Sequence, residues 1–282
     1  MNLLLKLSIL IIIIILSGCA PFQQKQEKLK TIAELEGFNF ERVLTGQFLL
    51  STFKKINPND RELVVYIEGD GYAWKRKNIL SDNPTPKNPV ALNLALKDPR
   101  DSILYIARPC QYLSKEQLEN CQPKYWSSHR YAEEVISSIN NVIERVKLQS
   151  GKQFINLIGY SGGGSVAALV ATLRNDVSSI ITVVANLDHE KWTEIHNITP
   201  LSGSLNASDY ALKNENIPQI HLVGANDDIV PVSISKSYKQ KAGNKKFIKI
   251  EIISNYNHHC CWEQQWITLL CKYQIIESGY CS

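Results

Sequence analysis

The sequence predicts an α/β protein with a mostly parallel central sheet, helices on both faces of that sheet and a small cap. Short apolar and β-branched runs alternate with helical segments along most of the chain, which is typical of parallel βαβ units. A serine flanked by glycines, Ser161, stands after one of these runs and before a helical segment, as in turns that carry a nucleophile. The 282 residues are enough for one large domain with a substantial core.

Six strands and two helices are recognisable from residue patterns. The predicted strands are apolar runs bounded by turn residues, at 63–67, 102–107, 154–158, 179–185, 219–223 and 246–253. Apolar residues recur every three or four positions from Tyr131 to Val146, which predicts an amphipathic helix that ends near Gly151. Residues 165–173, rich in Ala, Val and Leu, are expected to form a buried helix. The polar stretch 187–216 is expected to form the cap.

The N-terminus is expected to be an export signal. Residues 1–18 combine a basic start at Lys6 with an apolar run too short for a comfortable membrane span, which is typical of a secretory signal peptide. The Leu-Ser-Gly-Cys run that ends at Cys19 resembles the lipobox of bacterial lipoproteins. That resemblance implies a lipid attached to Cys19, a tether over 19–40 and a folded domain over 41–282.

Composition excludes several classes of protein, and the residue after the lipobox indicates the location. A hydrophobic share of 44% and a charged share of 21% exclude wholesale disorder and a polytopic membrane protein. The net charge of +4 is small and scattered, so nucleic acid is not an expected partner. Ala20 stands where an aspartate usually retains lipoproteins at the inner membrane. We therefore expect anchoring in the bacterial cell envelope, at the outer membrane and facing the periplasm or the surface.

Export changes the interpretation of the cysteines beyond Cys19, because disulfides persist in oxidising compartments. These disulfide candidates are Cys110, Cys121, Cys260, Cys261, Cys271 and Cys281. A Cys110–Cys121 bridge is favoured because it would close a short loop, and the other pairings stay open. A metal site over 258–261 is not expected, since four consecutive residues cannot easily turn all their side chains toward one ion.

Ser161 lies in Gly-Tyr-Ser-Gly-Gly, which matches G-x-S-x-G. Flanking glycines let a strand and a helix approach closely at a sharp turn, so that the serine hydroxyl is exposed at the top of the sheet. The N–H of Gly162, at the start of the helix, can then point at a developing negative charge. The lysine of a phosphate-binding loop is absent, and no complete G-x-G-x-x-G occurs, so nucleotide binding is not expected.

A nucleophilic serine needs a base and a group that orients the base. Asp227 and Asp228 follow the fifth predicted strand, and His258 and His259 follow the sixth. Ligands of parallel sheets bind at the carboxyl ends of the strands, so these side chains are expected to meet Ser161 there. The chain order of serine, acid and histidine is that of α/β hydrolases.

On these motifs, residues 63–270 resemble a bacterial α/β-hydrolase-fold lipoprotein of the esterase and lipase type. The first aspartate of the family's G-x-x-D-x-[IV]-V-P pattern is Asp227, so the resemblance implies Asp227 as the acid, with Asp228 as the alternative. It favours His258, which precedes a tryptophan by four residues, over His259.

The family's oxyanion hole takes its second N–H from the loop after the first predicted strand. This chain has Glu-Gly-Asp-Gly at 68–71 where the family often has His-Gly-Gly. The donors implied are therefore Gly162 and either Asp70 or Gly71. Arg108, which follows the second predicted strand, belongs either to the site or to a surface ion pair.

The resemblance implies a serine hydrolase that cleaves a small-molecule or lipid-like carboxylic ester through an acyl-enzyme, with neither metal nor organic cofactor. Acyl transfer and amide or peptide hydrolysis on the same three residues are alternatives, because spacing cannot distinguish them. A surface lipoprotein that only binds a partner is a third alternative. A complete set of serine, acid and histidine argues against that last one, since a binding module has no need for it.

Overall fold

The computed structural model describes residues 20–76, 78–118 and 121–281. Its centre is an eight-stranded sheet with the strand order β1-β2-β6-β3-β7-β8-β9-β10. The strands are β1 (Asn39–Thr45), β2 (Phe48–Lys55), β3 (Glu62–Ile67), β6 (Ile103–Ile106), β7 (Phe154–Tyr160), β8 (Val177–Val183), β9 (Gln219–Gly224) and β10 (Ile248–Ile253). The strands from β6 to β10 in this order pair in parallel, and β1 and β2 add antiparallel at one edge. The predicted mostly parallel sheet is confirmed.

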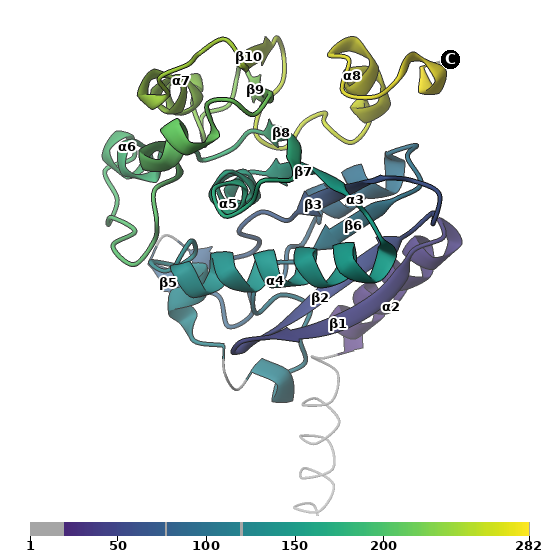
Figure 1. Ribbon diagram of the computed structural model, residues 1–282. Helices are drawn as coiled ribbons and strands as arrows, with labels where there is room; N and C mark the ends of the chain where they lie inside the picture. The colour runs from purple at the N-terminus through teal and green to yellow at the C-terminus, as the bar shows by residue number, and fades with distance from the viewer. Residues whose placement is uncertain (1–19, 77, 119–120, 282) are drawn as a thin grey trace, which may run out of the picture.

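Helices cover both faces of the sheet (Figure 1). They are α2 (Ala20–Leu35), α3 (Val90–Lys97), α4 (Glu133–Ser150), α5 (Gly162–Ala171), α6 (His189–Ile195), α7 (Val232–Lys241) and α8 (Trp266–Lys272). Short 3-10 helices lie at Glu116–Leu118, Pro123–Trp126, Ala207–Asn214 and Ser278–Tyr280, and β4 (Trp74–Arg76) pairs with β5 (Ile79–Leu80) in a small separate hairpin. The expected cap region therefore contains α6 and one 3-10 helix.

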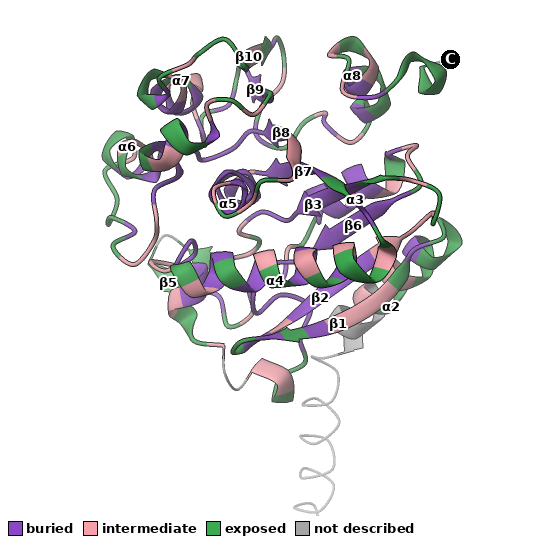
Figure 2. Ribbon diagram, in the orientation of Figure 1, coloured by how far each residue is buried: buried purple, intermediate pink, exposed green. Residues whose placement is uncertain are grey.

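Strand β3 shows why both faces need a covering layer. Leu63, Val65 and Ile67 pack with α4 and α5 in one hydrophobic cluster, whereas Val64 and Tyr66 pack with α3 and α8 in the other. Side chains alternate along a strand, so an apolar strand requires helices on both sides. Figure 2 shows the result, with burial concentrated in the sheet and on the inner sides of the helices.

The segment expected to be a tether differs from the prediction over its described part. Residues 20–35 form α2, and β1 begins at Asn39, inside the range assigned to the tether. Ala33 and Phe38 are buried, and they pack in the same cluster as Phe53 of β2. The composition of α2 is mostly polar and resembles that of a linker, because only a narrow apolar stripe of the helix faces the domain.

The expected signal peptide (1–18) and the lipidation site at Cys19 lie outside the described residues. Among the residues that the structure describes, no helix has the length and apolar character needed to cross a membrane.

Three disulfides link the six cysteines of the domain. They are Cys110–Cys121, the pair that the spacing favours, Cys260–Cys261 and Cys271–Cys281. Within the described ranges, no group of three or more histidine, cysteine or carboxylate side chains is arranged to hold a metal ion.

Candidate active site

Ser161 stands alone in the turn between β7 and α5. Its backbone has φ +51° and ψ −123°, a conformation that is strained for a residue with a side chain and typical of a nucleophile turn. A Cβ atom at Gly159 would collide with the carbonyl of Gly163, and one at Gly163 would collide with the carbonyl of Ile67. The glycines therefore allow β7, α5 and β3 to meet closely enough to expose the serine.

His258 joins Ser161 to Asp227. Its Nε2 lies 3.0 Å from the Ser161 Oγ, and its Nδ1 lies 2.9 Å from the Asp227 Oδ2. The other carboxylate oxygen of Asp227 accepts hydrogen bonds from the backbone N–H groups of Ile229 and Val230. With Nδ1–H donated to the buried carboxylate, the lone pair of Nε2 faces the serine hydroxyl.

The loop after β10 holds His258 in place through its neighbours. The side chain of Asn257 accepts hydrogen bonds from the N–H groups of His259 (2.9 Å) and Cys260 (2.8 Å). Trp262 donates its indole N–H to the Asn257 carbonyl, and Tyr160 donates its hydroxyl to the His258 carbonyl. The backbone of the loop is thus held on both sides of the imidazole.

The alternative residues lie elsewhere. Asp228 is exposed on the loop after β9. His259 lines the cavity and lies 3.4 Å from the Tyr160 hydroxyl, and it contacts neither the Ser161 hydroxyl nor the Asp227 carboxylate through a hydrogen bond in the described chain. Burial, and then the neighbouring His258, lower the pKa of His259. Of the paired candidates, the structure brings Asp227 and His258 to the serine.

The loop after β3 passes over the start of α5. A Cβ atom at Gly162 would collide with the carboxylate of Asp70, so the two residues are in direct contact. Gly162 is the first residue of α5, and its N–H has no carbonyl in a preceding helical turn. Within the described chain, neither the Asp70 N–H nor the Gly71 N–H donates a hydrogen bond. Asp70 and Gly71 line the same cavity as Ser161, so these three N–H groups are the candidate oxyanion donors.

Two carboxyl groups of this loop have opposite surroundings. Asp70 binds Arg108 (3.1 Å) and Arg130 (2.7 Å), and it accepts a hydrogen bond from the Tyr131 hydroxyl. Burial raises the pKa of Asp70, but the two guanidinium charges outweigh it and hold the pKa below its ordinary value. Glu68 accepts hydrogen bonds and forms no ion pair among the residues that the structure describes, and burial raises its pKa to about 7.

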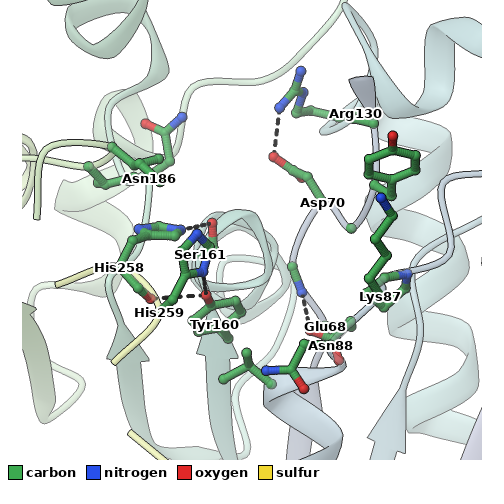
Figure 3. Close-up of a pocket in the computed structure, with 18 of the residues that line it drawn as sticks. Glu68, Asp70, Lys87, Asn88, Arg130, Tyr160, Ser161, Asn186, His258 and His259 are labelled. Atoms are coloured by element: carbon green, nitrogen blue, oxygen red, sulfur yellow. Dashed lines mark hydrogen bonds and ion pairs between the residues drawn. The ribbon is translucent and has the colours of Figure 1, made fainter. Parts of the chain in front are cut away.

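A cavity of about 570 Å³ opens in front of Ser161. Figure 3 shows Ser161 and His258 on one side of it and Asp70 and Arg130 on the other. The side chains that give the wall its apolar character are Tyr72, Trp74, Val90, Trp192, Ile229 and Val230. Trp192 belongs to α6, so the expected cap region does contribute to the wall of the site.

Sequence reasoning missed part of this site. Arg108 was a candidate, either for the site or for a surface ion pair, because it follows a predicted strand. It is buried two residues after β6 and reaches the cavity wall through Asp70. Arg130 lies in the segment before α4, with no motif around it that marks it as a site residue. Glu68 was visible only as a departure from the family's usual histidine.

A match to a protein family covers more than half of the chain. The family described as Serine hydrolase (FSH1) matches residues 91–252, a stretch that includes Ser161 and Asp227. The chain belongs to the FSH1 family of serine hydrolases. The predicted class of enzyme, a serine hydrolase, is therefore confirmed. Comparison with curated protein sequences finds no match.

Solved structures share the fold of this FSH1 serine hydrolase. Alpha/beta hydrolase GrgF from Penicillium sp. sh18 has a TM-score of 0.60 and 11% identity, covering 84% of this chain and 96% of that chain. A membrane phospholipase A, described as a novel bacterial virulence factor, has a TM-score of 0.57 and 14% identity, covering 99% of this chain and 98% of that chain. A putative lipase from Acinetobacter baumannii AYE has a TM-score of 0.53 and 13% identity, covering 89% of this chain and 96% of that chain. The expected α/β-hydrolase fold is confirmed.

Proposed function

We propose that this serine hydrolase cleaves carboxylic esters through an acyl-enzyme on Ser161. The observation that carries the proposal is the continuous hydrogen-bonded series Ser161–His258–Asp227 beside the cavity. A serine hydroxyl is a weak nucleophile until an adjacent base removes its proton, and the base acts only when a third group orients it. Both conditions are met by groups at hydrogen-bond distance.

The reaction proceeds in two halves. Ser161 Oγ attacks the ester carbonyl carbon while its proton passes to His258 Nε2, and the carbonyl electron pair moves onto the oxygen. The N–H groups of Gly162 and of Asp70 or Gly71 bind this oxyanion. The tetrahedral intermediate then expels the alcohol, which takes the proton from His258. Water repeats the sequence on the acyl-enzyme and releases the carboxylic acid and free Ser161.

A lipid-like ester fits the surroundings of Ser161. A second cavity of about 590 Å³ shares Trp74, Arg130 and Trp192 with the first and continues along Ile198 and Leu201. Two adjoining, partly apolar cavities suit a substrate with a long hydrocarbon arm. The similar structures include a membrane phospholipase A and a putative lipase, which supports the same substrate class.

The sequence of residues 1–19 supports export and a lipid anchor at Cys19, which would hold the enzyme on an envelope membrane. Three disulfides suit an oxidising compartment. Expression with a radiolabelled fatty acid should label the wild type in the membrane fraction and leave Cys19→Ala unlabelled. Equal labelling of both proteins would contradict the anchor.

Labelling with a fluorophosphonate tests the nucleophile. The wild type should label and hydrolyse p-nitrophenyl esters, Ser161→Ala should do neither, and Ser278→Ala, at an exposed C-terminal position, should match the wild type. Leu201→Trp, which narrows the second cavity, should reduce kcat/KM for dodecanoate and leave the value for acetate unchanged. A wild type that does not label, or that cleaves matched amides faster than esters, would refute the proposal.

A further inference from the structure

The oxyanion side of the site contains a charge that should hinder catalysis. The carboxylate of Asp70 touches Gly162, whose N–H is one of the proposed donors to the oxyanion. A negative charge next to the place where a second negative charge develops raises the energy of the transition state, and it does so most in a poorly hydrated site. Asp70 is therefore harmful there unless its charge is compensated.

Two arginines more than compensate the negative charge of Asp70. Arg108, two residues after β6, and Arg130, in the segment before α4, each bind one oxygen of the Asp70 carboxylate. Only 4% and 8% of their side-chain surfaces are exposed, compared with 17% for Asp70. Guanidinium groups remain charged at any pH at which a protein is folded. Two positive charges and one negative charge leave this cluster with a net charge of +1 beside the oxyanion.

The same contacts fix the position of the loop. Asp70 carries one of the proposed N–H donors on its own backbone, so whatever holds its side chain also aims that N–H. The Arg108 guanidinium also donates a hydrogen bond to the Arg130 carbonyl, which links the two segments that hold Asp70. Gln111 donates to the Gly69 carbonyl (3.1 Å) and steadies the loop one residue earlier.

We propose that Arg108 and Arg130 are positioning residues of the oxyanion hole. They aim the 69–71 loop at the substrate carbonyl oxygen through the Asp70 carboxylate, and they make the electrostatic potential at that oxygen positive. This inference rests on the proposed ester hydrolysis and adds to it residues outside the Ser161–His258–Asp227 series. Asp70 forms no hydrogen bond to any side chain of that series in the described chain.

Charge-removing and charge-keeping substitutions separate this role from a structural one. Arg130→Gln and Arg108→Gln should each lower kcat/KM for p-nitrophenyl butyrate about tenfold to a hundredfold, somewhat less than the loss of a direct oxyanion donor. Arg130→Lys, which retains the positive charge, should recover part of that loss. The affinity for butaneboronic acid, which forms a tetrahedral anion on the serine, should fall by the same factor as kcat/KM. Rates are normalised to active sites titrated with a fluorophosphonate, so that unfolded protein does not count.

Arg100→Gln is the matched control. Arg100 forms a largely buried ion pair with Asp98 and is not part of the cavity wall, so its loss should lower the melting temperature without changing the normalised kcat/KM. If the Arg108 and Arg130 variants behave like this control, the inference is wrong while ester hydrolysis stands. If the wild type neither reacts with the fluorophosphonate nor hydrolyses the ester, the proposed function itself is wrong.

Discussion

Two carboxylates lie on opposite sides of Ser161, and their partners differ in kind. Asp227 is bound by an imidazole and two backbone N–H groups, whereas Asp70 is bound by two guanidinium groups and a phenol. An imidazole accepts and releases a proton near neutral pH, but a guanidinium does not. In the proposed mechanism, the side with Asp227 moves a proton, and the side with Asp70 holds a fixed charge.

The difference predicts how each side fails. Loss of a proton-moving group stops the reaction, because no neighbour replaces it. Loss of a fixed charge weakens the stabilisation of the oxyanion, but the same reaction still proceeds at a lower rate. The proton-moving side should therefore show far larger effects on the rate than the side around Asp70.

The largest effect is expected at the histidine pair. His258→Ala should lower kcat/KM about 10⁵-fold, since the serine loses its base. His259→Ala is the matched control and should cost less than about tenfold, because His259 has no hydrogen bond to the serine or to Asp227 in the described structure. Initial rates with p-nitrophenyl butyrate provide the measurement. Comparable losses in both variants would contradict the distinction between them.

The aspartate pair should give the next largest effect. Asp227→Asn is expected to lower kcat/KM about 10³- to 10⁴-fold, because an amide no longer favours the imidazole tautomer that leaves Nε2 free. Asp228→Asn removes an exposed carboxylate from the same loop and should change the rate less than twofold. A large effect of Asp228→Asn, with Asp227→Asn near the wild type, would reverse the assignment.

Glu68 is a buried carboxyl on the Asp70 loop for which burial, rather than a neighbouring charge, determines the pKa. Its folded pKa of about 7 lies above the ordinary value of 4.5, so the folded state binds the proton more tightly than the unfolded state. The stabilisation from this group is complete below about pH 4.5 and is lost as the pH rises through about 7, and its size is about 3 kcal/mol.

Glu68→Gln should remove this pH dependence. The free energy of unfolding, measured in urea at pH 5 and pH 8, should fall more steeply with pH in the wild type than in the variant. Glu194→Gln, at an exposed position, should retain the wild-type dependence. Parallel pH profiles for the wild type and Glu68→Gln would show that Glu68 is ionised throughout, like Asp70.

The smallest effects are expected from the disulfides. Cys110 is buried two residues after Arg108, so the Cys110→Ala/Cys121→Ala variant should lose about 2 kcal/mol of stability and a few-fold in kcat/KM. Cys271→Ala/Cys281→Ala frees an exposed end of the chain, far in sequence from the Asp70 cluster, and should leave kcat/KM unchanged. Equal kcat/KM in both double variants would show that the Cys110–Cys121 disulfide does not influence the oxyanion side of the site.

Prediction from the sequence succeeded where the signal was local. The six parallel strands were recognisable because each is a short apolar run, and Ser161 because glycines flank it. The antiparallel strands β1 and β2 were missed, since β1 mixes charged and apolar residues and the antiparallel pairing depends on a partner strand. The helix α2 was also missed, because its apolar residues are few and form a buried face only by packing with Phe38 and Phe53 in the folded protein.

The sequence by itself determined the class of the sheet, the turn that exposes Ser161 and the chain order of serine, acid and histidine, because these follow from periodicity and from short motifs. Only the tertiary structure decided which histidine and which aspartate reach Ser161, since adjacent residues on a loop point in different directions. The same holds for Asp70 and its arginines. Arg130 is 60 residues from Asp70, and they meet because the sheet places β3 between β6 and β7 and packs α4 over them.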